Sequence, residues 1–363
     1  MKPHDAVRFL LDRGLLTAED VVSGHLSVED AIGRNDNLLI RSCTGRSYAF
    51  KHAADGDPGA RMLALEAAVY EHASGPGASP ALAALGPFVP RFALFDRSEA
   101  VLVTHLAHDT RELWELDVPG DALPAIGSAL GVALAACHAI RGEAIPEPLR
   151  ERQPPWILGL HRQDPSILRD AWPAHLEVIS LVQANDATCA TFDRLQGGWT
   201  RDRLIHGDVK LSNMLVRTTS EMDTSPSVIL LDWETASLGE PAWDVGSVFQ
   251  LVLWHALHSV FNTDEEMPAA DPRNAFDERL ALYRPEMHRF WNAYRASAEG
   301  DMVPALERTT EWCGARLIQS AYEEASGLEH PSLFCLSLLQ LGVNLLADPR
   351  AAARDLLRVD ETS

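Results

Sequence analysis

The amino-acid sequence predicts an α+β protein with two lobes, a small strand-rich lobe followed by a larger, mainly helical one. Short apolar runs separated by turn-forming residues fill residues 25–106, which is the pattern of a sheet. Helical periodicity then prevails over residues 122–140, 164–196 and 245–347. The length of 363 residues is enough for two lobes of ordinary size.

The composition is strongly acidic, with a formal net charge of −21 and a pI near 5.0. We expect no nucleic-acid partner, because binding to a phosphate backbone requires a clustered basic surface. The acidity would favour a cationic acceptor by long-range steering, but it is equally explained by solubility alone. The second explanation is the simpler one.

The cysteines and the apolar runs bear on the cellular compartment. Five scattered cysteines without a C-x-x-C pair favour a reducing compartment with free thiols. Charges interrupt the apolar residues at the N-terminus, so we expect no signal peptide, and no apolar run approaches the ~20 residues of a membrane span. The sequence therefore predicts a cytoplasmic protein that does not bind a membrane.

Residues 1–24 predict a helical extension before the first lobe. Apolar residues recur at helical spacing over residues 5–22, and Thr17 can cap a second helical segment that begins at Ala18. This extension either serves as a lid or partner contact or packs against the sheet, and we favour packing.

The first lobe, residues 25–106, is predicted to contain five strands and one helix. The helix spans Gly59–Ala73, where apolar residues follow helical spacing. The strands are bounded by turn-forming residues. They are expected at Leu26–Ala31, Leu38–Cys43, Ser47–Ala53, Val89–Phe95 and Ala100–Leu106.

Helices dominate the prediction for the second lobe. A helix over 122–140 is followed by a Pro-rich connector at 141–155 and by helical segments over 164–196. Four later helices are expected to pack as a bundle. They span Val245–Val260, Leu280–Ala296, Val303–Ala325 and Leu333–Ala347.

A short hairpin is predicted between these two groups of helices. The apolar runs Asn213–Val216 and Val228–Leu231 flank a polar connector rich in Ser, Thr, Asp and Pro. This hairpin would bring Asp208, Asn213 and Asp232 together. Such a cluster suits phosphoryl transfer, which needs a base beside the attacking hydroxyl and hard oxygen ligands for Mg²⁺.

Three motifs around this hairpin resemble those of one enzyme family. They are H-G-D-x-x-x-x-N at 206–213, D-x-E at 232–234 and G-x-P-x-x-D at 239–244. With them, the chain resembles the aminoglycoside phosphotransferase and choline kinase-like family. The resemblance implies a bilobal protein-kinase-like fold, with a small antiparallel-sheet N-lobe plus helix C and a larger, mainly helical C-lobe.

The resemblance also implies roles for the lobes. The N-lobe, residues 25–106, would bind the nucleotide, and the C-lobe, residues 107–363, would carry the catalytic residues and bind the acceptor. The inserted helical segments at 164–196 would build the acceptor pocket. The implied cofactors are ATP and Mg²⁺.

The principal site residues follow from the same resemblance. Asp208 would act as the base or orient the acceptor hydroxyl, and Asn213 with Asp232 would hold Mg²⁺. Lys51 would contact the nucleotide phosphates, with Glu66 as the carboxylate that positions it. Glu71 is the alternative partner of Lys51, although helical periodicity turns it to another face.

Further site residues depend on position alone. The turn containing Gly33 and Arg34 would lie over the phosphates, although the G-x-G-x-x-G pattern is absent. Backbone groups of Thr104 and Leu106 would read the adenine in a hinge. Lys210 either neutralises the transferring phosphoryl group or faces solvent.

Four residues near the motifs are expected to have other roles. His206 is expected to hold the catalytic loop, and His138 to be buried in a helix. By resemblance, Asp244 would anchor the loop from the following helix. Glu234 is either a neighbour of the metal or a surface carboxylate.

Three functions remain open from the sequence. The first is ATP-dependent transfer of the γ-phosphate to a hydroxyl of a small-molecule natural product, such as an aminoglycoside-like compound. The second is phosphorylation of Ser or Thr in a precursor peptide of ribosomal peptide natural-product biosynthesis (lanthipeptide or thioamitide type), with a separate lyase as partner. This alternative rests on the run DWETASLGEPAWDVGSVFQ and the Arg34–Asn35 turn, which look similar to peptide-pathway kinases. The third, a nucleotide-binding pseudokinase, is disfavoured because Lys51, Asp208, Asn213 and Asp232 are all present.

Overall fold

The computed structural model describes most of the chain and divides it into two compact units. The described residues are 1–31, 36–42, 45–54, 58–107, 110–112, 126–150, 154–162, 165–169, 171–217, 227–261 and 271–359. The first unit comprises Met1–Leu113, Glu143–Arg150 and Asn213–Ala236. The second unit comprises Trp114–Gly142, Glu151–Ser212 and Ser237–Ser363.

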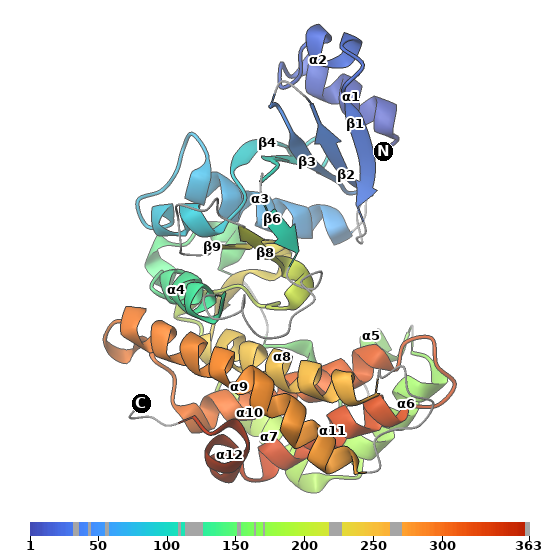
Figure 1. Cartoon of the computed structure of the whole chain (residues 1–363), viewed down its shortest axis with the longest axis vertical. Coiled ribbons are helices and arrows are strands. Elements are labelled where there is room, and N and C mark those ends of the chain that lie inside the picture. Colours follow the sequence, from blue (N-terminus) through green and yellow to red (C-terminus); the bar gives the residue numbers. More distant parts are fainter. Residues whose placement is uncertain are drawn as a thin grey trace. The chain divides into compact units, whose positions relative to one another are not determined.

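A five-stranded antiparallel sheet forms the centre of the first unit (Figure 1). Its strands run in the order β1-β2-β3-β5-β4, and the long helix α3 (Pro58–Ser74) contacts β3, β4 and β5. The predicted strands and helix are confirmed, with ends shifted by a few residues. The strands are β1 (Ser27–Ala31), β2 (Asp36–Arg41), β3 (Tyr48–His52), β4 (Phe92–Asp96) and β5 (Val101–His105).

The N-terminal helices α1 (Pro3–Asp12) and α2 (Ala18–Val22) pack onto this sheet. The ring of Phe9 meets that of Phe50 on β3 edge to face at 5.7 Å between centroids, inside one apolar cluster. Thr17 caps α2 as predicted, in a reciprocal capping box with Asp20. Residues 1–24 therefore cover the sheet, which confirms the packing interpretation.

The predicted hairpin is present in the first unit. Strands β8 (Met214–Arg217) and β9 (Ser227–Leu230) pair antiparallel, and β6 (Thr110–Glu112) adds a third strand beside β8. The connector at 218–226 lies outside the described residues. After β9 the chain enters a 3-10 turn, η7 (Trp233–Thr235), which α3 contacts. The buried indole of Trp233 donates a hydrogen bond to the Leu230 carbonyl at 2.9 Å and fixes this turn.

The second unit is mainly helical, as predicted. A short antiparallel pair, β7 (Arg203–Ile205) with β10 (Ser237–Gly239), lies beside α4 and the start of α8. The larger helices are α4 (Ile126–His138), α6 (Pro173–Gln183), α7 (Asp186–Gly197), α8 (Pro241–Phe261), α9 (Pro272–Ser297), α10 (Leu306–Glu324) and α11 (Leu333–Ala347). Shorter helical segments are α5 (Pro165–Leu168), α12 (Pro349–Ala351) and a π-helical stretch at Ala352–Leu357.

One predicted helix boundary is wrong by a clear margin. Helix α9 begins at Pro272, whereas the periodicity predicted a start at Leu280. The Asp271 side chain accepts hydrogen bonds from the backbone N–H groups of Arg273 and Asn274, and Pro272 occupies the first helical position. This cap stabilises a first helical stretch that carries little apolar periodicity.

Glycine permits the closest helix contacts in the second unit. A Cβ at Gly246 on α8 would lie 2.8 Å from both the Thr309 carbonyl and the Cys313 amide of α10. At Gly131 on α4 it would lie 2.5 Å from the Phe290 carbonyl of α9. These helices approach backbone to backbone and so hold α8, whose first turn carries Asp244, in a fixed place.

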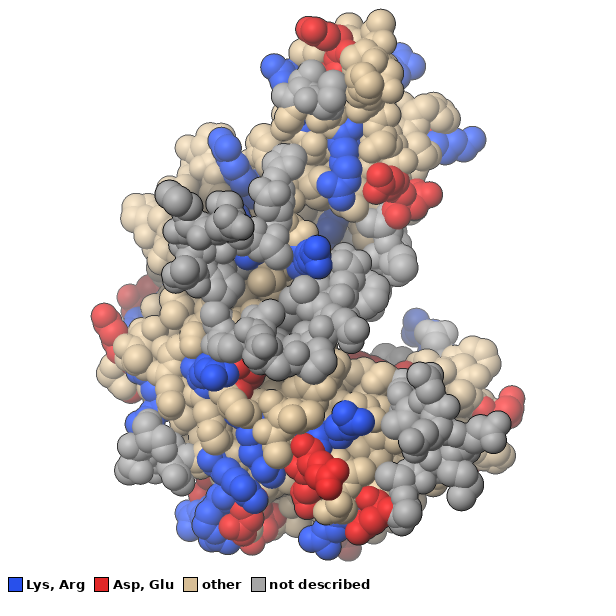
Figure 2. All heavy atoms as spheres, in the orientation of Figure 1, with Lys and Arg blue, Asp and Glu red and all other residues tan. Residues whose placement is uncertain are grey.

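Membrane-spanning potential, thiols and surface charge complete the description. Over the described ranges, no helix combines the length and apolarity needed to cross a bilayer. Cys137, Cys189, Cys313 and Cys335 are all free thiols. Figure 2 shows acidic and basic side chains interspersed over the helices of the second unit.

Candidate active site

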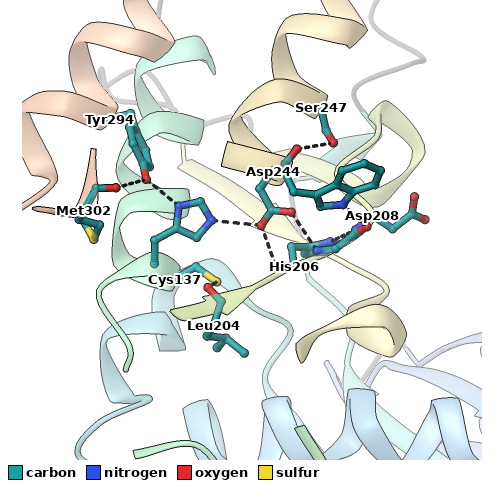
Figure 3. Close-up of polar contacts among 11 residues, drawn as sticks. Cys137, Leu204, His206, Asp208, Asp244, Ser247, Tyr294 and Met302 are labelled. Carbon is teal, nitrogen blue, oxygen red and sulfur yellow. Dashed lines mark hydrogen bonds and ion pairs between the residues drawn. The ribbon is translucent and has the colours of Figure 1, made fainter. Parts of the chain in front are cut away.

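A loop after β7 in the second unit carries Asp208, and Asp244 holds that loop. Asp244 lies fully buried in the first turn of α8. Its Oδ2 accepts a hydrogen bond from the His206 amide at 2.7 Å, and its Oδ1 accepts one from the Gly207 amide at 2.9 Å (Figure 3). Gly207 has φ +84°, a conformation that favours glycine. The predicted anchoring role of Asp244 is confirmed.

Two more helices support this anchor through buried contacts. His138 on α4 places Nε2 3.1 Å from Asp244 Oδ2 and Nδ1 2.8 Å from the Tyr294 hydroxyl of α9 (Figure 3). Burial raises the pKa of Asp244, but the hydrogen bond and charge of His138 and the Gly207 amide lower it more, so its pKa falls below the ordinary value. His138 is the buried structural residue that the sequence predicted.

Asp208 lies between two cations in the second unit. Lys210 places its Nζ 2.7 Å from Asp208 Oδ2, and Arg316 on α10 places Nη2 3.5 Å from Asp208 Oδ1. Burial raises the pKa of Asp208, but Arg316 and then Lys210 lower it more, so the pKa of this carboxyl lies below its usual value. Asp208 is therefore ionised at neutral pH and can accept a proton or a hydrogen bond.

Sequence reasoning missed Arg316. It is separated from the motif block by several helices, and no fixed spacing links it to Asp208. One signal was available in the sequence. The run Trp312–Ser320 has the apolar pattern of a buried helix and contains an arginine. A fully buried arginine is rare unless it is paired with an acid.

The first unit gathers Lys51, Glu66 and Asp232 around one amine. Lys51 Nζ on β3 lies 2.7 Å from Glu66 Oε1 and 3.0 Å from Oε2, and it also pairs with Asp232 Oδ1. The Glu66 side chain on α3 is 1% exposed and accepts a further hydrogen bond from the Tyr70 hydroxyl at 2.7 Å. The predicted Lys51–Glu66 pair is present, and Glu71 is not the partner.

The two carboxylates fix the charge of Lys51. Burial lowers the pKa of the Lys51 amine, but Glu66 and Asp232 raise it more, so it stays above its ordinary value. The amine is therefore a permanent cation at neutral pH. Its place beside Asp232, at the end of the hairpin, suits contact with an anionic group.

Asn213 and Asp232 flank the open end of the hairpin. The Asn213 carbonyl accepts a hydrogen bond from the Leu231 amide at 2.8 Å, which ties the two strand ends together. Asp232 adopts a left-handed conformation with φ +57°, and its side chain is 42% exposed. A strained backbone in a non-glycine residue often marks a functional position.

The donor set at this strand end fits a magnesium ion. A carboxylate and a carboxamide supply hard oxygen ligands, which Mg²⁺ prefers. In the described part of the chain, no group of three His, Cys, Asp or Glu side chains could hold a metal ion alone. Mg²⁺ commonly takes one or two protein ligands and completes its shell with water and phosphate oxygens.

Of the other predicted site residues, Thr104 and Leu106 lie in the described part of the chain. Gly33 and Arg34 lie outside the described residues. Thr104 is buried in β5, where it pairs with Ala49 of β3. The Leu106 amide donates to the Ser47 carbonyl at 2.9 Å, so that N–H group is engaged within the first unit.

Comparison with known proteins identifies the class. A model of the Phosphotransferase enzyme family matches residues 33–273, and the chain belongs to this family. It is an enzyme, a phosphotransferase with an alcohol group as acceptor, as the sequence predicted. The comparison with curated proteins gave no match.

Solved structures confirm the predicted bilobal kinase-like fold. LicA, a choline kinase of Streptococcus pneumoniae, is 17% identical in its AMP complex, with 94% of this chain and 97% of that chain covered and a TM-score of 0.51. The GDP and kanamycin complex of APH(2")-IIia is 14% identical, with 96% and 99% covered and a TM-score of 0.52. A microcompartment-associated aminopropanol kinase is 13% identical, with 93% and 96% covered and a TM-score of 0.50.

Proposed function

We propose that this phosphotransferase moves the γ-phosphate of ATP to a hydroxyl group of a small-molecule natural product. The observation that carries the proposal is the partly buried Lys51 amine, which Glu66 and Asp232 hold as a cation. Three distant segments of the sequence converge on this one charge. A structural ion pair alone would not need a second carboxylate at an exposed strand end.

Residues 25–106 are the proposed nucleotide-binding part. Lys51 binds the phosphates and Glu66 positions its amine. Thr104 and Leu106 mark the proposed hinge beside the adenine, although Thr104 is paired within the sheet and the Leu106 N–H donates to the Ser47 carbonyl. Asn213 and Asp232 would hold Mg²⁺, which when bound neutralises phosphate charge. The structural neighbours named as AMP and GDP complexes support a nucleotide substrate.

Asp208 is the proposed base, and residues 107–363 form the proposed catalytic and acceptor-binding part. The Asp208 carboxylate orients the acceptor hydroxyl and takes its proton as the new O–P bond forms and the bond to the leaving ADP breaks. Lys210 neutralises charge on the transferring group. The charge assigned to Asp208 agrees with its lowered pKa.

The proposed acceptor is a small hydroxylated compound, with aminoglycoside-like natural products as the first class to test. Support comes from structural neighbours whose names include choline kinase, aminopropanol kinase and a kanamycin complex. The proposed compartment is the cytoplasm.

A peptide acceptor is the second candidate, and one segment of the chain favours it. Trp156, Leu168, Trp172 and Leu176 are exposed apolar side chains on the segment that precedes α7. Exposed apolar side chains in one segment suit contact with an extended peptide. In that case Ser or Thr of a precursor peptide is phosphorylated, and a separate lyase acts next.

The test is ATP consumption by the full chain with Mg²⁺, screened against an aminoglycoside panel and a Ser/Thr-rich precursor peptide. We expect turnover with one acceptor class, its loss in Asp208→Asn, and its loss on chelation with restoration by added Mg²⁺. Phosphate found on the peptide would select the second candidate. Nucleotide binding without turnover on any acceptor would refute both.

A further inference from the structure

Arg316 belongs to a row of side chains along one face of α10. Arg308, Trp312 and Arg316 are spaced four residues apart, so they lie one above another on the helix. Trp312 contacts the ring of Trp243 edge to face at 5.5 Å between centroids, and the Arg316 guanidinium lies 5.4 Å from the Trp243 centroid. Trp243 therefore fixes where Arg316 points.

Trp243 also binds the loop that carries Asp208. Its Nε1 donates a hydrogen bond to the Gly207 carbonyl at 2.9 Å. The same indole thus contacts the residue before Asp208 and the guanidinium beside Asp208. The rigid indole of Trp243 therefore sets the position of the Arg316 guanidinium relative to the loop that carries Asp208.

The burial of Arg316 is costly for stability. Its side chain is only 4% exposed, and its Nε has no hydrogen-bond partner in the part of the chain that the structure describes. A buried donor left unsatisfied has lost its water without gaining a protein partner, which destabilises the folded state. An apolar residue at this helical position would avoid that cost, so packing alone does not explain the arginine.

The two cations differ in how firmly they are held. Lys210 is 45% exposed and meets Oδ2 of Asp208, whereas Arg316 is buried and meets Oδ1. A lysine on an exposed stem can move to another anion, while a guanidinium stacked on an indole stays in place. Movement of Lys210 therefore changes the surroundings of Oδ2 and leaves the contact of Arg316 with Oδ1 in place.

We propose that Arg316 is a positioning residue for the reaction, which holds Oδ1 of Asp208 so that Oδ2 faces the acceptor hydroxyl once Lys210 turns to the transferring phosphoryl group. This inference rests on the proposed function, in which Asp208 receives the hydroxyl proton. Arg316 itself touches neither substrate nor the reacting atoms. Its contribution is to the orientation of Asp208 and should appear in kcat rather than in the KM for ATP.

The first experiment tests the coupling without any acceptor. Thermal unfolding of the full chain is compared for Asp208→Asn, Arg316→Met and the double variant. We expect the double variant to lose less stability than the two single losses added together, because each single change leaves one charge partner behind. The control pair is Asp208→Asn with Arg308→Met, since Arg308 lies on the same face but pairs with Glu240 at 2.6 Å. There we expect additive losses, and additivity for the Arg316 pair would overturn the inference.

The second experiment separates positioning from folding. With Mg–ATP and an acceptor identified by the screen, or with water as the acceptor, we expect Arg316→Met to lower kcat about 10- to 100-fold while the KM for ATP changes less than about twofold. Arg316→Lys, which keeps the charge, should recover part of kcat. An unchanged kcat per folded Arg316→Met molecule would overturn the positioning role. Absence of Asp208-dependent turnover in the unaltered protein would instead refute the proposed function, and the unfolding cycle would still decide whether Arg316 and Asp208 are coupled.

Discussion

Replacement of Asp244 by alanine should strongly destabilise the protein. The fully buried carboxylate accepts hydrogen bonds from the His206 and Gly207 amides and pairs with His138. Removing one partner of a buried charged network costs about 3–5 kcal/mol. Each backbone donor left unsatisfied contributes about 1–3 kcal/mol to such a loss.

We therefore expect Asp244→Ala to lower the free energy of unfolding by about 4 kcal/mol, taken from the middle of the range for a broken buried pair. Chemical denaturation with a fitted midpoint and slope measures this value. The matched control is Asp355→Ala, whose exposed carboxylate pairs with the neighbouring Arg354 on the surface. The denaturation midpoint of Asp355→Ala should equal that of the unaltered protein. A loss below about 1 kcal/mol for Asp244→Ala, which is typical of an ordinary substitution, would refute the anchoring role.

Three further predictions concern the Lys51 ion pair in the first unit, the pH dependence of stability, and the packing of α8 against α10. Lys51→Met should destabilise the protein by about 3–5 kcal/mol because the buried Glu66 loses its cation and keeps its hydrogen bond from Tyr70. Adding Glu66→Gln should recover part of that loss in a denaturation assay. Because the folded-state pKa of Asp244 is depressed, its contribution to stability is present above the ordinary value of 3.8 and is lost as the pH falls through the lower folded value. Between about pH 5 and pH 2, the unfolding midpoint should therefore fall more steeply in the unaltered protein than in Asp244→Asn, and parallel curves would contradict this linkage. Gly246→Ala should cost about 1–3 kcal/mol by overpacking α8 against α10, whereas an unchanged melting temperature would show that the helices can separate slightly.

Local sequence patterns predicted the helices and strands because capping, turn formation and apolar periodicity depend on neighbouring residues. Alternating apolar residues and turn formers marked the strands of the first unit, and the Thr17 cap marked the start of α2. The Lys51–Glu66 pair was predicted by motif position, since a strand lysine and a helix carboxylate recur at that place in related folds. The start of α9 was missed because a cap at Asp271, rather than apolar periodicity, determines it.

Contacts between residues far apart in the chain could not be predicted from the sequence, because no local pattern indicates them. Arg316 reaches Asp208 through the packing of α10 against Trp243, which no spacing in the chain reveals. The backbone approach at Gly246 is likewise visible only when α8 and α10 are placed side by side. Sequence reasoning thus identified the charges of the site but not the helix that orients one of them.

Cys137 provides a built-in reporter on the loop. Its buried thiol lies next to His138 in sequence and donates to the Leu204 carbonyl of β7 at 3.4 Å. Burial raises the pKa of this thiol well above its ordinary value, so a thiol reagent reacts only when α4 and β7 separate. The rate of Cys137 labelling, measured by mass spectrometry, would therefore report how often this part of the second unit opens. A ligand that stabilises the loop would lower that rate.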